Sequence, residues 1–192
     1  MSQIIDFYYD IVSPYSYLAA VQMAELEAAT GAQVIWKPIF LGGLLKQLGN
    51  ATPLSNQPKK HYMLTLDLPR CARYYQVAYT RPEVFPANTL QVQRAMAALP
   101  ADQRPQLALA LYQAYWSEGQ DVSQSQLAEE IMGTEIAALG SAETAKAALK
   151  DFTDELIAAG GFGAPTLIWK DQLYFGSDRV ALLKVDLLAS KG

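Results

Sequence analysis

The sequence predicts an α/β fold in which a block of helices interrupts a small β-sheet. Three observations lead to this expectation. The chain starts with a strand–helix–strand pattern, it ends with a helix–strand–strand–helix pattern, and residues 61–150 contain no convincing strand. Layered folds of this kind bury one face of each helix on the sheet. We therefore expect the order βαβ, then helices, then αββα.

The first unit opens with an almost continuous apolar run over residues 4–9, which suits a central strand covered on both faces. A helix is expected over residues 14–29, closed by Gly31, and a second strand over residues 33–37 before Pro38. A strand, a helix and a strand within about 35 residues form a βαβ unit, whose second strand lies parallel to the first.

The middle of the chain is a series of helices separated by polar turns. Residues 49–60 are rich in Pro, Asn and Ser, which predicts a loop. Apolar spacing and helix-capping residues predict helices over 44–48, 61–75, 88–99, 103–117, 124–131, 134–139 and 142–158.

The end of the chain returns to strands. A short apolar strand is expected over residues 166–169, a turn over 170–172, a returning strand over 173–175 and a last helix over 178–189. The two strands form an antiparallel hairpin.

The complete order is that of a thioredoxin-like fold with an all-helical insertion between its two halves. We expect residues 1–43 and 142–192 to form the thioredoxin-like domain and residues 44–141 to form the helical insertion domain.

The composition argues against several classes of function. The net charge of −4 lacks the basic character of nucleic-acid-binding proteins. No apolar run reaches the roughly 20 residues that span a bilayer, and the chain enters a strand at once, so no signal peptide is expected. The single cysteine, Cys71, allows no internal disulfide, and the single histidine, His61, leaves few ligands for a metal. We expect a cytoplasmic protein without nucleic-acid, membrane or metal partners.

The stretch Ser13-Pro14-Tyr15-Ser16 joins the first strand to the first helix. Pro14 suits the first helical turn, and Ser13 is then at or near the N-cap. The two serines have the spacing of a redox Cys-x-x-Cys pair. Because they carry hydroxyls in place of thiols, a disulfide reaction through this motif is excluded. Capping alone is one interpretation. The other is an anion site, where the hydroxyl, free N–H groups and the helix dipole stabilise a thiolate that belongs to a ligand.

Two further segments offer partners for such a ligand. Pro165 precedes a buried strand, and a cis bond there would let the backbone of Ala164 pair with an extended peptide. The alternative is an ordinary proline at a strand edge. Ser177 and Asp178 begin the last helix, where they either cap it or bind the carboxylate and ammonium of an α-amino acid head group.

These motifs resemble those of the kappa-class glutathione transferases and the 2-hydroxychromene-2-carboxylate isomerases, a DsbA-like branch of the thioredoxin superfamily. The resemblance covers essentially the full length. It rests, in order, on Phe7-Tyr8-Tyr9-Asp10, Ser13-Pro14-Tyr15-Ser16-Tyr17-Leu18, Gly49-Asn50, Asp67-Leu68, Phe85-Pro86-Ala87-Asn88-Thr89-Leu90, Gly161-Phe162-Gly163-Ala164-Pro165-Thr166 and Phe175-Gly176-Ser177-Asp178-Arg179. It implies a DsbA-like fold, glutathione as cofactor and a homodimer.

The resemblance implies that Ser13 is the catalytic residue and hydrogen-bonds the glutathione sulfur. The residues expected to hold glutathione are Asn50, Lys60, Ala164, Pro165, Ser177 and Asp178. The residues expected at the substrate are Tyr15, Lys59, Asn88 and Arg94, where a basic group would bind a carboxylate. Lys59 and Lys60 are alternatives for the family's lysine, and such a pair is otherwise usually a solvated face.

The implied function is a glutathione-dependent cis–trans isomerase that acts on 2-hydroxychromene-2-carboxylate, or a similar aromatic 2-oxo acid, in naphthalene-type hydrocarbon catabolism. A kappa-class transferase or peroxidase that conjugates or reduces small electrophiles is the alternative. The run Phe175-Gly176-Ser177-Asp178-Arg179 is closer to the transferase form than to the Trp-Gly-Asn-Asp-Arg of isomerases. A third possibility is a non-enzymatic thioredoxin-fold protein that has lost its cysteines.

Overall fold

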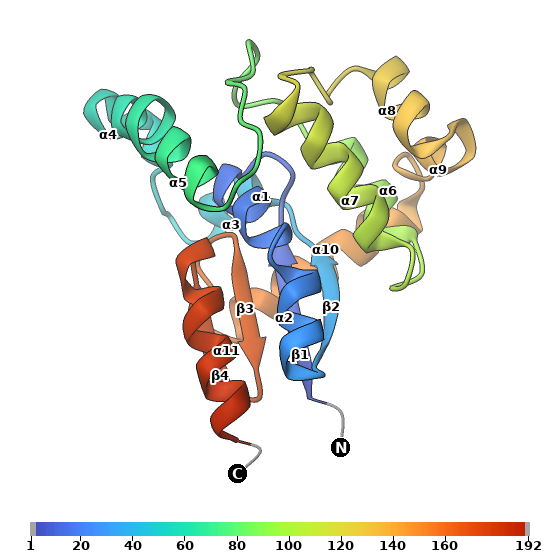
Figure 1. The fold of residues 1–192 in the computed structure, drawn as a ribbon. Coiled ribbons are helices and arrows are strands. Elements are labelled where there is room, and N and C mark those ends of the chain that lie inside the picture. The colour runs from blue at the N-terminus through green and yellow to red at the C-terminus, as the bar shows by residue number, and fades with distance from the viewer. Residues whose placement is uncertain (1–2, 191–192) are drawn as a thin grey trace.

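A four-stranded mixed sheet forms the base of the molecule, and a group of helices covers one end of it (Figure 1). This computed structural model describes residues 3–190. The strand order is β2 (Gln33–Pro38), β1 (Ile4–Tyr9), β3 (Thr166–Trp169) and β4 (Gln172–Phe175). β1 and β2 are parallel, whereas β3 runs antiparallel to both β1 and β4. The predicted βαβ unit and the predicted hairpin are both confirmed.

Helices cover both faces of the sheet. α1 (Pro14–Ala20), α2 (Met23–Thr30) and α11 (Val180–Ala189) lie on one face, where α11 packs on α2. α3 (Leu41–Gln47) and α10 (Glu143–Ala158) lie on the other face and contact each other. This two-sided cover explains why the first strand is apolar at nearly every position.

Alternate residues of β1 enter different clusters of the core. Phe7 and Tyr9 belong to the main apolar cluster, which reaches into the helical group. Tyr8 points to the opposite face and packs with Leu44 and Leu156 in a second cluster. Both assignments follow from the period of two in a strand. The predicted central strand is therefore confirmed by its burial.

The remaining helices lie between α3 and α10 in the sequence. They are α4 (Gln57–His61), α5 (Leu68–Tyr74), α6 (Leu90–Ala98), α7 (Arg104–Tyr112), α8 (Ser125–Met132) and α9 (Thr134–Leu139). Short turns of 3₁₀-helix cover Pro53–Ser55 and Ser177–Arg179, and π-helix covers Tyr62–Asp67 and Gln113–Ser117. Within residues 3–190, no helix is long and apolar enough to cross a membrane.

The helix predicted over residues 14–29 is wrong at its middle, because the chain bends at Gln22 between α1 and α2. The Gln22 side-chain amide donates to the carbonyl of Leu18 (2.6 Å) and to that of Ser177 (3.1 Å). A side chain that takes over a backbone carbonyl interrupts the helical ladder. The same contact ties the bend to the segment that starts α11.

The loop predicted over residues 49–60 is wrong at its end, because α4 begins at Gln57. The Asn56 side chain accepts a hydrogen bond from the N–H of Lys59 (3.1 Å), and Pro58 occupies the first helical turn. Both are ordinary helix-start signals. The two neighbouring lysines therefore lie on a helix and project from defined faces.

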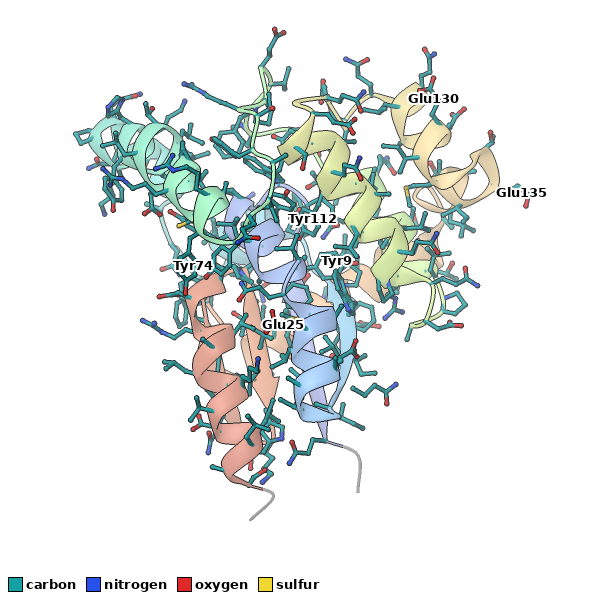
Figure 2. The ribbon with its side chains drawn as sticks, in the orientation of Figure 1. Tyr9, Glu25, Tyr74, Tyr112, Glu130 and Glu135 are labelled. Atoms are coloured by element: carbon teal, nitrogen blue, oxygen red, sulfur yellow. The ribbon has the colours of Figure 1, made fainter. Side chains whose placement is uncertain are left out.

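The predicted division into two domains stays a prediction. Its first boundary, between residues 43 and 44, falls within α3, and its outermost residues, 1–2 and 191–192, lie outside the described residues. The main apolar cluster continues from the sheet into the helical group. Figure 2 shows Tyr9 of β1 and Tyr112 of α7 at this junction, and their ring centroids are 6.2 Å apart.

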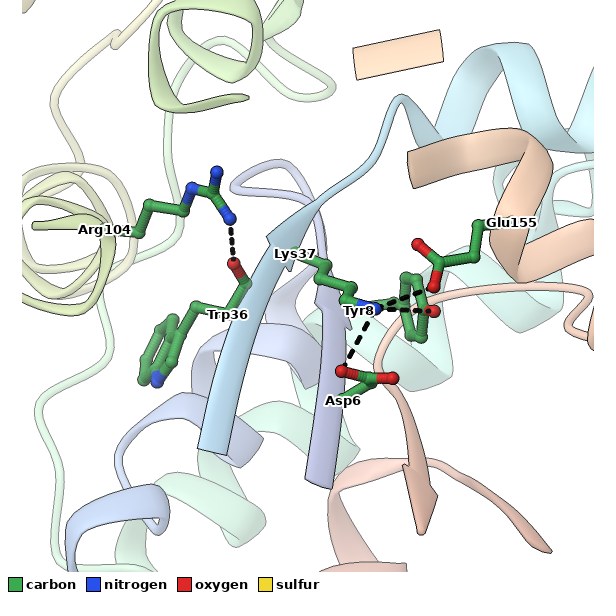
Figure 3. A network of polar contacts seen from close by, with 6 residues as sticks. All are labelled: Asp6, Tyr8, Trp36, Lys37, Arg104 and Glu155. Atoms are coloured by element: carbon green, nitrogen blue, oxygen red, sulfur yellow. Dashed lines mark hydrogen bonds and ion pairs between the residues drawn. The ribbon is translucent and has the colours of Figure 1, made fainter. Parts of the chain in front are cut away.

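Polar contacts on both sides of β2 fix helices to the sheet (Figure 3). The Lys37 ammonium lies 3.1 Å from a carboxylate oxygen of Asp6 and 2.7 Å from one of Glu155, on α10. On the other side, Arg104 of α7 donates to the Trp36 carbonyl (3.1 Å). The Arg104 side chain is buried, and its guanidinium also donates twice to the Leu99 carbonyl (3.1 Å and 2.8 Å).

Replacing Arg104 with methionine should lower the free energy of unfolding by about 2–4 kcal/mol, because buried carbonyls lose a charged donor. The carbonyls concerned belong to Trp36 and to Leu99, which accepts a bond of 2.8 Å. Urea denaturation measures the change, and Arg73→Met on the exposed face of α5 is the control. A loss under about 1 kcal/mol would mean that water replaces the guanidinium without cost.

Candidate active site

Ser13 caps the start of α1, directly beyond the end of β1. The side chain is buried, with 4% of its surface exposed. Its Oγ accepts a hydrogen bond from the Ser16 N–H (3.2 Å) and donates one to the Ala164 carbonyl (3.0 Å). The Ala164–Pro165 peptide bond is cis, which agrees with the first of the two interpretations of Pro165. The fold thus joins two predicted motifs whose contacting residues are 151 positions apart in the chain.

A buried carboxylate fixes the loop that carries Ser13. One oxygen of Asp10 accepts from the Thr89 hydroxyl (2.7 Å) and the Val12 N–H (3.1 Å), and the other accepts from the Leu41 N–H (2.9 Å). Burial raises the pKa of this carboxyl group. Since Leu41 begins α3 and Thr89 precedes α6, Asp10 connects three elements. The sequence prediction did not include this role, although a charged residue after a buried strand is a usable signal.

The helical group also bonds to this loop. The Tyr112 hydroxyl donates to the Asp10 carbonyl (3.2 Å), and the Trp116 indole N–H donates to the Ile11 carbonyl (2.9 Å). Trp116 lies in the π-helical turn Gln113–Ser117. π-helical turns often occur at functional sites. The position of Ser13 therefore depends on α7 as well as on the sheet.

The start of the last helix lies beside the cis-proline. The Gly176 N–H donates to the Pro165 carbonyl (3.0 Å). Gly176 has a φ of +109°, a backbone conformation that strains other residues, so glycine is favoured there. Ser177 is buried, and its carbonyl accepts from the Tyr75 hydroxyl (3.5 Å). The exposed Asp178 carboxylate pairs with Arg179 (2.8 Å).

Unused hydrogen-bonding groups gather around Ser13. Within residues 3–190, the backbone N–H groups of Tyr15 and Ala164 have no acceptor. With the hydroxyls of Ser13 and Ser177, they can bind an extended ligand that carries an anion. Within residues 3–190, the Oγ of Ser13 forms hydrogen bonds only with the backbone of Ser16 and Ala164, so no base activates it as a nucleophile.

A pocket of about 450 Å³ opens beside α1, against the segment formed by α4 and the π-helix Tyr62–Asp67. Its lining residues are Tyr15, Pro58, Lys59, Tyr62 and Met63. The Tyr15 hydroxyl donates to a carboxylate oxygen of Asp67 (2.6 Å), and burial together with this bond raises the pKa of the Tyr15 phenol. Two residues predicted at the substrate, Tyr15 and Lys59, thus share one largely apolar pocket.

Other predicted site residues lie elsewhere. Lys60 projects from the opposite face of α4 and lines a separate pocket. Asn50 is exposed in the segment that joins α3 to α4. Asn88 is exposed, and its side-chain oxygen accepts a backbone N–H two residues later (3.2 Å). Arg94 lies on α6, which packs mainly on α9 and α10. The roles of these four residues stay predictions.

Within residues 3–190, the site around Ser13 contains neither a cluster of metal ligands nor a reactive cysteine. No group of three or more His, Cys, Asp or Glu side chains there could hold a metal. Cys71 is a free, partly buried thiol on α5. Burial and the nearby carboxylates of Asp67 and Asp178 raise its pKa, so it stays protonated near neutral pH.

The fold and the match to a family of known domains define the class of protein. Residues 4–188 match the family of DSBA-like thioredoxin domains, and the chain belongs to this family. The predicted DsbA-like, thioredoxin-like fold is thereby confirmed.

Within this family the chain resembles isomerases and glutathione transferases. It is 31% identical over 196 residues to the 2-hydroxychromene-2-carboxylate isomerase of Sphingobium xenophagum, covering 98% of this chain and 100% of that relative. It is 27% identical to glutathione S-transferase kappa 1 of Rattus norvegicus, covering 94% and 89%. A solved structure of 2-hydroxychromene-2-carboxylate isomerase has a TM-score of 0.84 at 25% identity, covering 96% and 94%. The resemblance seen in the motifs is confirmed.

Proposed function

We propose that this protein is a glutathione-dependent cis–trans isomerase of 2-hydroxychromene-2-carboxylate, or of a similar aromatic 2-oxo acid from naphthalene-type catabolism. The observation that carries the proposal is the buried Ser13 hydroxyl beside the backbone of Ala164, in a thioredoxin-like frame with serine at both cysteine positions. The similarity to named isomerases supports it. A homodimer and a cytoplasmic location stay predictions.

The groups around Ser13 fit a tripeptide thiol. The Ser13 hydroxyl and the Tyr15 N–H would hold the sulfur, and the N–H and carbonyl of Ala164 would pair with the cysteinyl backbone. Ser177 and Asp178 would hold the carboxylate and ammonium of the γ-glutamyl head. When bound, glutathione supplies a thiolate that adds reversibly to a conjugated double bond, so that the bond can rotate before the thiolate leaves.

Ser13 would make its contribution by stabilising charge. A hydrogen bond to a charged acceptor contributes about 1.5–3 kcal/mol, which corresponds to one or two units in the pKa of the bound thiol. To donate to sulfur, the hydroxyl must turn from the Ala164 carbonyl, which an incoming backbone N–H can then occupy. The thiolate that adds to the substrate is also the group that leaves, so the substrate is rearranged and glutathione is not consumed.

The pocket beside α1 suits an aromatic acid. Tyr15, Tyr62 and Met63 offer apolar surface, and Lys59 offers a positive charge. Asp67 holds the hydroxyls of both tyrosines, at 2.6 Å and 3.3 Å, so the aromatic walls are preformed. We infer that an aromatic ring lies between these walls and that Lys59 binds the substrate carboxylate.

Lys59→Ala should raise KM for the anionic substrate about tenfold, since a charged hydrogen bond of about 1.4 kcal/mol is lost. The adjacent Lys60→Ala removes the same charge from the other face of α4 and is the matched comparison. Steady-state kinetics with each substrate varied in turn give both KM values. If Lys60→Ala has the larger effect on either KM, Lys60 is the family's lysine and the assignment of Lys59 is wrong.

A kappa-class transferase or peroxidase is the alternative. The run Phe175-Gly176-Ser177-Asp178-Arg179 has the transferase form, and the chain is also similar to kappa-class transferases. Such an enzyme would release a conjugate or consume thiol, whereas an isomerase would conserve it.

One comparison tests both functions. The purified protein is incubated with glutathione and 2-hydroxychromene-2-carboxylate, and separately with glutathione and 1-chloro-2,4-dinitrobenzene, while product and free thiol are measured. Isomerisation with constant free thiol supports the proposal. Stoichiometric loss of thiol with the dinitrobenzene alone supports the transferase. Absence of glutathione binding by calorimetry would rule out both functions.

A further inference from the structure

A second, basic pocket lies on the opposite face of the same helical segment. It has a volume of about 190 Å³. Its lining residues are Gln57, Lys60, His61, Leu64, Thr65 and Arg81. Residues 58, 59, 62 and 63 of this segment line the pocket beside α1. The two pockets therefore lie on opposite faces of one continuous helical segment. For this reason the neighbours Lys59 and Lys60 reach different pockets.

Two hydrogen bonds hold the segment that carries Arg81 beside the basic pocket. The Tyr79 hydroxyl donates to the carbonyl of Leu64 (3.0 Å), which ties the segment after α5 to the pocket floor. The N–H of Thr80 donates to the Trp116 carbonyl (2.8 Å). Both contacts are within two residues of Arg81. The backbone beside Arg81 is therefore held near this segment, and the exposed Arg81 side chain lines the pocket together with residues of α4.

The charges of the basic pocket lack partners. The two cationic side chains that line it are Lys60 and Arg81, and neither forms an ion pair with a carboxylate within residues 3–190. No acidic side chain lines the pocket, although the whole chain has a net charge of −4. Like charges brought together repel each other, and a bound anion relieves this repulsion.

The shape and the donors indicate the class of anion. Arg and Lys are the side chains that best bind carboxylate and phosphate oxygens, and Gln57 and Thr65 add neutral donors. The volume is below the roughly 300 Å³ at which pockets for drug-sized ligands begin. We propose that this basic pocket binds a small, doubly charged oxyanion, of the phosphate or short dicarboxylate type, at a site separate from Ser13.

Calorimetric titration with inorganic phosphate, and in a second arm with succinate, tests the proposal at constant ionic strength set with chloride. We expect saturable binding of one anion per chain in at least one arm, and the tighter arm identifies the type. Arg81→Gln and Lys60→Gln should each raise the Kd about tenfold or more, because each removes one charged donor. Lys59→Gln, whose side chain lines the other pocket, should change the Kd less than about twofold.

Glutathione titrations separate this result from the proposed function. Arg81→Gln should leave the Kd for glutathione unchanged, and phosphate should not compete with glutathione. Non-saturable binding in both arms would overturn the proposal, as would an equal loss of affinity in Lys59→Gln. Competition between the anion and glutathione would show that the basic pocket is part of the glutathione site. Circular dichroism of each variant establishes that the fold is retained.

Discussion

Ser13→Ala should lower kcat/KM of the proposed glutathione-dependent reaction about 10- to 100-fold, because a hydrogen bond of about 1.5–3 kcal/mol to the thiolate is lost. The hydroxyl is buried beside the Ala164 carbonyl, so water cannot easily take its place. The bound thiol should show the same loss as a higher pKa. A group whose pKa rises ionises only at higher pH, so the acidic limb of the rate profile should move up by about one unit.

The controls separate this role from helix capping. Ser13 also accepts the Ser16 N–H, and loss of a cap costs about 0.5–2 kcal/mol of stability. Ser13→Thr keeps the hydroxyl and the cap, and should retain most activity. Ser16→Ala is the matched control. It removes a buried hydroxyl three positions further along the same helix, and this hydroxyl has no hydrogen-bond partner within residues 3–190. If Ser13→Ala lowers the melting temperature but leaves kcat/KM and the thiol pKa unchanged, Ser13 is only a cap.

Local sequence signals were sufficient for the parts of the site that lie at element boundaries. The order of Ser13 and Pro14 specifies a helix start whatever lies around it, and the structure has this cap. A proline directly before a buried strand made Pro165 a candidate for a cis bond, with an ordinary strand-edge proline as the alternative, and the bond is cis. Gly31, in the left-handed conformation at φ +61°, closes α2 for the same local reason.

Contacts between distant segments were not predictable in this way. The bend at Gln22 depends on the Ser177 carbonyl, which only the folded chain brings near. The two lysines, Lys59 and Lys60, are equivalent in composition, and only the helical phase of α4 separates them between two pockets. That phase follows from the Asn56 cap, a local signal that the loop-like composition of residues 49–60 obscured.

Asp10 is the clearest case of a residue whose role depends on the folded chain, and Asp10→Ala should cost about 3–5 kcal/mol of unfolding free energy. The substitution leaves the Thr89 hydroxyl and the N–H groups of Val12 and Leu41 without acceptors in the interior. Each unsatisfied buried donor costs about 1–3 kcal/mol. Activity should fall as well, because the loop that presents Ser13 loses its attachment to α3 and α6.

Asp10→Asn is the informative partner variant. One oxygen remains for Thr89 and Val12, but an amide N–H₂ would face the Leu41 N–H, so we expect a smaller loss of about 1–3 kcal/mol. Urea denaturation measures both losses, and Asp171→Ala, in the exposed turn between β3 and β4, should change stability by less than about 0.5 kcal/mol. A similar small effect in Asp10→Ala would show that water satisfies these donors.

The pH dependence of stability tests the charge on Asp10 directly. Burial raises the pKa of this carboxyl group in the folded chain above its ordinary value of 3.8. Between the two pKa values, the folded state therefore holds a proton that the unfolded state has already lost. The contribution of Asp10 to the free energy of unfolding is full below about pH 4 and is lost as the pH rises through the folded-state pKa. The stability of the wild type relative to Asp10→Asn should fall over that window. A constant difference, or one that grows as the pH rises, would mean that the three donors hold the pKa down and that burial does not dominate.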